Sequence, residues 1–146
     1  MRKSLATFAL IAAALTAAGC GSSSSPAAKL AAKVEPICTR HNTAIAGIDT
    51  TILTPGEVKT VARKRAAVEQ ATLTELSSLT APASSEPGWS QFIAYRRSLI
   101  NDLTALGKIG LTGLTGGKLL ESAGSVQSKM FATAKRAGFK ECSQAG

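Results

Sequence analysis

Histidine and aromatic residues are scarce in this chain of 146 residues, which has one His, one Trp, one Tyr and four Phe. The single histidine, His41, excludes an HExxH zinc site, and the three widely spaced cysteines exclude CxxC and CxxCH motifs. A Gly-x-Ser-x-Gly nucleophile motif is also missing. The sequence offers no pattern for an enzyme, a metal site or a cofactor site, so we expect a non-enzymatic protein that binds no cofactor.

Long hydrophobic runs are few, and the clearest one lies between Leu5 and Ala18. It is shorter than the roughly 20 apolar residues that a helix needs to cross a bilayer. Two positive charges, Arg2 and Lys3, precede it, and small residues lead from it to Cys20. This order is typical of a cleaved secretory signal peptide.

The tetrapeptide Ala17-Ala18-Gly19-Cys20 resembles the lipobox of bacterial lipoproteins. The resemblance implies cleavage before Cys20 and a lipid, such as palmitate, on the mature N-terminal cysteine. Residues 1–19 would be the signal peptide, 20–26 the lipidated cysteine with a Ser-rich tether, and 27–146 the folded domain. We therefore expect a protein anchored to the extracytoplasmic face of a bacterial membrane, in the cell envelope. Ala17 replaces the more usual Leu, so plain secretion remains the alternative.

The number of cysteines agrees with lipidation. The chain has three, Cys20, Cys38 and Cys142, and an odd thiol in an exported protein needs an explanation. A lipid on Cys20 leaves Cys38 and Cys142 as a pair. In an oxidising compartment, we expect these two to form a disulfide.

Apolar residues recur every three or four positions, which predicts an all-α fold of four helices, at about 27–48, 54–79, 85–106 and 118–137. Thr54-Pro55-Gly56-Glu57 is a helix-start signal, and Gly138-Phe139 is typical of a Schellman stop. Pro36 predicts a kink or a restart in the first helix. The glycine-rich stretch 107–117 is expected to leave the helical conformation. Short connections favour an up-down-up-down bundle, with Cys142 near the end where the first helix begins.

These features occur in a fixed order along the chain. A lipobox and Ser-rich tether come first, then Ile37-Cys38, Pro55-Gly56, Ala81-Pro82 before Trp89, and finally residues 138–142 with Cys142. In this order the chain resembles a broad group of small bacterial lipoproteins with a paired-cysteine helical domain. The resemblance implies a helical fold and a disulfide, and it carries no activity or site.

The charge balance is basic, with a net charge of +8 for the whole chain. Without Arg2 and Lys3, fifteen basic residues remain against nine acidic ones, which is +6. Such a surface attracts anionic lipid headgroups or acidic wall polymers. Nucleic acid is not expected, because aromatic residues do not interleave with the basic ones as a stacking platform requires.

Two arginines are the best candidates for a binding site. Arg65 and Arg96 lie on the inward stripes of adjacent predicted helices, where they could together receive a small anion. The simpler interpretation is two side chains whose stems are buried and whose charges reach solvent. Carboxylates such as Glu69 are expected on helix surfaces. His41 is expected to pack against a neighbour, and haem ligation with Met130 is disfavoured by the antiparallel register.

Two functional hypotheses follow. The favoured one is a lipoprotein held at the membrane by Cys20, which acts by contact with a protein, a cell-wall polymer or anionic lipid. The alternative is a helical bundle that binds or senses a small anionic ligand near Arg65 and Arg96.

Overall fold

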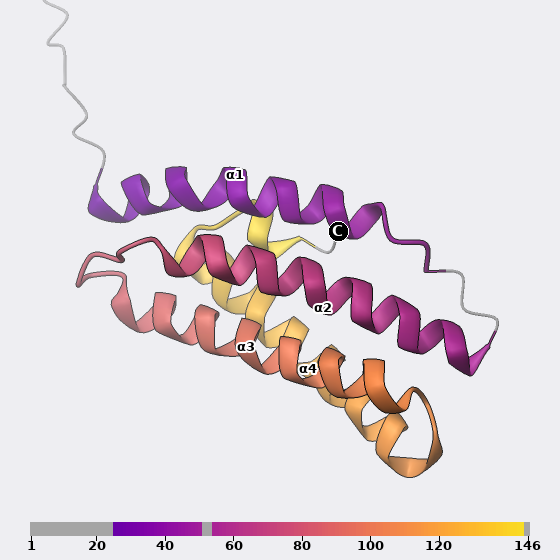
Figure 1. Cartoon of the computed structure of the whole chain (residues 1–146). Helices are drawn as coiled ribbons and strands as arrows, with labels where there is room; N and C mark the ends of the chain where they lie inside the picture. Colours follow the sequence, from indigo (N-terminus) through magenta and orange to yellow (C-terminus); the bar gives the residue numbers. More distant parts are fainter. Residues whose placement is uncertain (1–24, 51–53, 145–146) are drawn as a thin grey trace, which may run out of the picture.

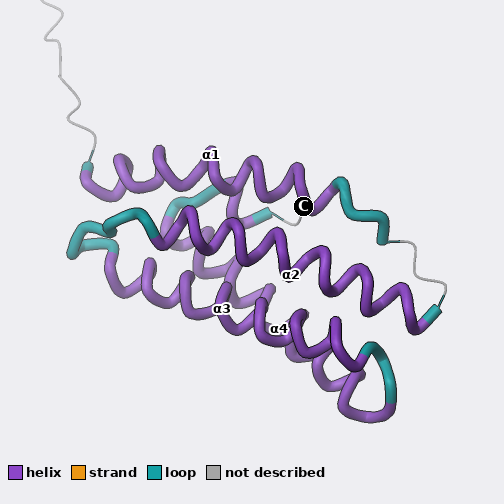
Figure 2. Tube along the Cα trace, viewed as in Figure 1, coloured by secondary structure: helices purple, strands orange, loops and turns teal. Residues whose placement is uncertain are grey.

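The computed structural model describes residues 25–50 and 54–144, and helices joined by loops make up these ranges (Figures 1 and 2). The elements are α1 Pro26–Ala46, α2 Pro55–Ser77, α3 Glu86–Ile109, α4 Gly113–Ala137 and a 3-10 turn, η1 Glu141–Ser143. No β-strand occurs in these ranges. The predicted signal peptide, Cys20 and most of the tether lie outside the described residues. Within them, no helix combines the length and apolar character that a membrane crossing requires.

Each helix runs antiparallel to the one before it (Figure 2). α2 packs against both α1 and α3, and α3 packs against α4. The remaining side is closed by η1, which contacts α1 and α4. The all-α class and the up-down-up-down order predicted from the sequence are confirmed.

The core is continuous through all four helices and the segment after α4. Three aromatic rings form its centre, and Phe139 lies 5.8 Å from both Trp89 and Phe92 between ring centroids. The other hydrophobic residues buried in this cluster come from every helix, among them Leu30, Val34, Ile37, Leu73, Leu76, Leu99, Leu103, Ala123 and Met130. A second, smaller cluster of Val58, Ala62 and Leu106 lies at the other end of α2 and α3.

Helix ends follow the predicted signals. Thr54 accepts a hydrogen bond from the Glu57 amide, and the Glu57 carboxylate accepts one from the Thr54 amide, which completes a capping box. Gly138 adopts the left-handed conformation at φ 80°, and the Phe139 amide donates to the Ala134 carbonyl at 2.9 Å. This is the Schellman motif, and it directs Phe139 into the core.

The first helix differs from the prediction in two respects. It begins at Pro26, which we had assigned to the tether, because Ser25 caps it by accepting a hydrogen bond from the Ala28 amide at 3.2 Å. It also continues through Pro36 without a restart. Pro36 and Ala32 are both exposed, so the Ala32 carbonyl that loses its partner lies on the solvent side.

The glycine-rich stretch is more helical than predicted. Only residues 110–112 leave the helical conformation between α3 and α4. Tertiary contacts account for the difference, because Gly107 and Gly116 allow close packing that a side chain would prevent. A Cβ at Gly107 would lie 2.8 Å from Cγ of Arg63, and one at Gly116 would lie 2.5 Å from the Gly110 carbonyl oxygen. Packing thus offsets the entropic cost of helical glycine.

Cys38 and Cys142 form the predicted disulfide, with their Cα atoms 5.0 Å apart. Its place differs from the expectation, since Cys38 lies twelve residues after Pro26 and therefore about 18 Å along α1. The segment after α4 runs back along α1 to reach it. Glu35 binds this segment too, because its carboxylate accepts hydrogen bonds from the amides of Lys140 at 2.6 Å and Glu141 at 2.8 Å.

Candidate functional site: a buried cluster on three helices

The most unusual chemistry in the described residues is a group of ionisable side chains inside the bundle. Glu69 of α2 and Arg96 of α3 are each 1% exposed, and His41 of α1 is 7% exposed. An ionised side chain is rarely buried unless it is paired, because leaving water costs several kcal/mol. The cluster must therefore satisfy its own charges.

Glu69 is the centre of the cluster. One of its carboxylate oxygens, Oε1, lies 2.9 Å from Nε2 of His41, and the other accepts a hydrogen bond from Nη1 of Arg96. One carboxylate thus connects α1, α2 and α3. The guanidinium of Arg96 also lies over the Phe92 ring, 5.3 Å from its centroid, where a cation is favoured.

His41 extends the network toward the C-terminal segment. Its Nδ1 lies 3.2 Å from Oδ1 of Asn42, and Nδ2 of Asn42 donates to the Glu141 carbonyl at 2.9 Å. The second bond orients the Asn42 amide, so both ring nitrogens of His41 face an oxygen.

The charges around Glu69 determine its protonation state. Burial acts to raise the pKa of the carboxyl group, but the hydrogen bond with His41 and the charges of Arg96, His41 and Arg65 together lower it below the usual 4.5. Glu69 is therefore ionised at neutral pH. Burial also lowers the pKa of Arg96, which Glu69 opposes, and a guanidinium remains protonated at neutral pH.

The two arginines predicted to form a binding site differ in their burial and in their partners. Arg96 is fully buried and paired, whereas Arg65 is half-buried one helical turn before Glu69. The Nε atoms of both arginines are buried, and neither Nε atom has a hydrogen-bond partner within the described part of the chain. The anion that faces them is the chain's own Glu69, which we had expected on the surface.

Neither arginine lines any of the larger surface hollows formed by residues 25–50 and 54–144. One of these hollows, of about 580 Å³, lies between the alanines at the start of α1 and the segment after α4, and Glu35, Ala137 and Lys140 contribute to it. Groups of three or more potential metal ligands do not occur among the residues described.

Glu69 was missed although a signal exists. Ala62, Glu69, Leu73 and Leu76 follow one another at seven, four and three residues, so they share one face of α2. All four are buried. The predicted inward stripe of this helix passed through Arg65, which is half-buried, and left out Glu69, which is buried.

The fold and the cluster define a class: a disulfide-linked, antiparallel four-helix bundle with a buried ion cluster. Comparison with known proteins gives no match among family models, curated sequences or solved structures.

Proposed function

We propose that this chain is a bacterial lipoprotein, anchored by a lipid on Cys20 at the extracytoplasmic face of a membrane, and that its bundle is a non-enzymatic interaction module. The observation that carries the proposal is the pairing of the cysteines. Because Cys38 and Cys142 are joined to each other, neither is available to Cys20, the third cysteine of the chain. A lipid on its sulfur explains that remaining thiol.

The basic character of the bundle supports a location at an anionic surface. The fifteen Lys and Arg that follow the signal peptide exceed the nine acidic residues. Of these fifteen side chains, that of Arg96 is buried and paired with Glu69. Others, such as Lys29, Lys33 and Lys64, are exposed. Headgroup phosphates and acidic wall polymers attract such a surface.

The buried cluster supports a structural role in this module. His41, Glu69 and Arg96 are almost closed to solvent, and their polar contacts join three helices. The alternative, a small-anion site between Arg65 and Arg96, lacks support, because Glu69 already faces both charges and neither side chain lines a described hollow.

The proposal is tested by metabolic labelling with a clickable fatty acid in a bacterial host, followed by membrane fractionation. The wild-type chain should carry the label and sediment with membranes. Cys20→Ala should lose the label, while Cys38→Ala/Cys142→Ala, which keeps Cys20, should retain it. An unlabelled wild-type protein, or a Cys20→Ala protein that still carries the label, would contradict the lipid anchor.

A further inference from the structure

The turn between α3 and α4 gathers the exposed large hydrophobic side chains of residues 25–50 and 54–144. Leu111 is 40% exposed, Leu114 86% and Leu120 51%. We call this region, residues 108–120, the distal tip. It lies at the end of the bundle opposite the start of α1 (Figure 1). Single exposed leucines are ordinary, but a group of three at one end needs a reason.

The backbone conformation of the distal tip keeps these leucine side chains on the surface of the bundle. Gly110 and Gly113 have φ values of +68° and +62°, which close the turn tightly. The turn then packs directly on α4, because a Cβ at Gly116 would lie only 2.7 Å from Cα of Leu111. Since backbone occupies the space beside α4, the side chains of Leu111 and Leu114 are left on the outer surface.

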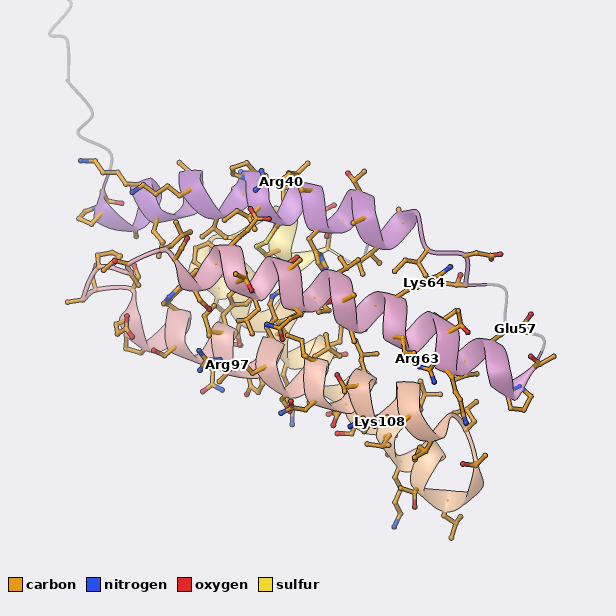
Figure 3. The ribbon with its side chains drawn as sticks, viewed as in Figure 1. Arg40, Glu57, Arg63, Lys64, Arg97 and Lys108 are labelled. Atoms are coloured by element: carbon orange, nitrogen blue, oxygen red, sulfur yellow. A yellow bond between two sulfur atoms is a disulfide. The ribbon has the colours of Figure 1, made fainter. Side chains whose placement is uncertain are left out.

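Basic side chains surround the leucines. Lys108 and Lys118 belong to the tip itself and are exposed. From α2, the Lys59 side chain lies against Gly110, and Nε of Arg63 donates to the Gly107 carbonyl at 2.8 Å. Lys108, Arg63 and Lys64 are seen in this half of the molecule in Figure 3. Residues 108–120 contain Lys108 and Lys118 and no acidic residue, while Asp49, Glu57, Asp102 and Glu121 lie nearby at the same end of the bundle.

We propose that the distal tip is a membrane-contact surface, which inserts Leu111 and Leu114 among the headgroups of an anionic bilayer while the surrounding lysines bind lipid phosphates. Leucine combined with lysine is the composition of protein segments that lie in the membrane interface. Each basic residue near an anionic membrane adds to the attraction. The centre of a protein interface is instead depleted in lysine, which makes a protein partner the poorer fit.

This contact would be additional to the proposed lipid on Cys20, and it does not depend on that lipid. The distal tip and the start of α1, which Cys20 precedes in the chain, lie at opposite ends of a bundle whose helix α3 is about 36 Å long. A bundle attached to one bilayer at both ends would lie along its surface. A test without Cys20 separates the two proposals, because it removes the lipid and leaves the tip unchanged.

The experiment uses the chain from Ser25 to Gly146, which includes the whole described core and the disulfide. Co-sedimentation is measured with vesicles of phosphatidylglycerol and phosphatidylcholine, and with phosphatidylcholine alone. We expect binding to the anionic vesicles, and about tenfold weaker binding for Leu114→Ser, since burial of one leucine contributes at least 1.4 kcal/mol. Lys108→Glu/Lys118→Glu should weaken binding to a similar extent at low salt.

The matched control is Lys29→Glu/Lys33→Glu, which makes the same change of charge at the start of α1. It should change binding less than twofold. Absence of binding to anionic vesicles, wild-type affinity in Leu114→Ser, or an equal loss in both charge variants would overturn the proposal. So would a dimer in analytical ultracentrifugation that Leu114→Ser dissociates while vesicle binding persists, because the tip would then be a contact between copies. Circular dichroism verifies that each variant is folded.

Discussion

Nε2 of His41 on α1 lies 2.9 Å from Oε1 of Glu69 on α2, inside a bundle that almost excludes solvent from both side chains. The other oxygen of the same carboxylate binds Arg96 on α3. The polar contacts that join α1, α2 and α3 in this cluster thus all involve Glu69. The contribution of Glu69 is therefore measurable by substitution and by pH.

Replacing Glu69 should be far more costly than replacing an exposed acid. Glu69→Gln leaves Arg96 buried without a counter-charge, which typically costs about 3–5 kcal/mol. The matched control is Glu75→Gln on the same helix, which breaks an exposed ion pair with Arg40 and should cost about 0.2–1 kcal/mol. Urea unfolding followed by circular dichroism compares the two. Equal losses in the two variants would show that the buried cluster does not stabilise the fold.

The same residue should produce a dependence on pH. Because the pKa of Glu69 is lowered in the folded chain, its ionised form favours folding above the unfolded value of 4.5. This contribution is lost as the pH falls from about 4.5 through the lower pKa of the folded state. We therefore expect the difference in unfolding free energy between wild type and Glu69→Gln to be smaller at pH 3 than at pH 5. A difference that is unchanged or larger at pH 3 would contradict the lowered pKa.

The disulfide should contribute strongly to stability. It joins residues 104 positions apart, and a loop of about that length corresponds to roughly 4.7 kcal/mol in the chain-entropy model. Cys38→Ala/Cys142→Ala should therefore unfold at a much lower temperature than wild type, and the melting temperature of this variant should not respond to reductant. Cys20→Ala should keep the wild-type melting temperature. Thiol labelling of the denatured, unreduced Cys20→Ala chain that detects Cys38 or Cys142 would refute the bond.

Two neighbouring glycines should respond oppositely to alanine. Gly116→Ala places a Cβ 2.5 Å from the Gly110 carbonyl oxygen, and we expect it to destabilise the fold by about 1–3 kcal/mol. Gly117→Ala meets no atom within 4 Å and should stabilise α4 by about 0.5–1 kcal/mol. Thermal unfolding distinguishes them. A stabilising Gly116→Ala would show that the turn does not pack on α4.

Local signals predicted the helix ends well, because their cause is contained in a few neighbouring residues. The capping box at Thr54 and Glu57 and the Schellman motif at Gly138 are of this kind. The helical conformation at Gly107 and Gly116 was not predicted, since Gly107 is packed against Arg63 of another helix and Gly116 against the turn at Gly110 and Leu111. Propensity alone does not contain that information.

The buried cluster was only partly predictable. His41 was expected to pack against a neighbour, and it does. Glu69 was placed on the surface, because an acidic residue is normally exposed unless a partner is known. That partner, Arg96, lies 27 residues away on the next helix, so only the tertiary structure reveals the pair. The pairing of Cys38 with Cys142 could be predicted because parity and compartment limit the choices.

The central claim is that Cys20 carries a lipid while Cys38 and Cys142 are joined. Intact-mass spectrometry of the protein isolated from bacterial membranes, without reduction, tests both parts at once. We predict a chain that begins at Cys20, carries the added mass of its acyl groups, and gains the mass of two hydrogen atoms only after reduction. A chain with a free, unmodified Cys20, or one that begins at another residue, would contradict the anchor on which the account depends.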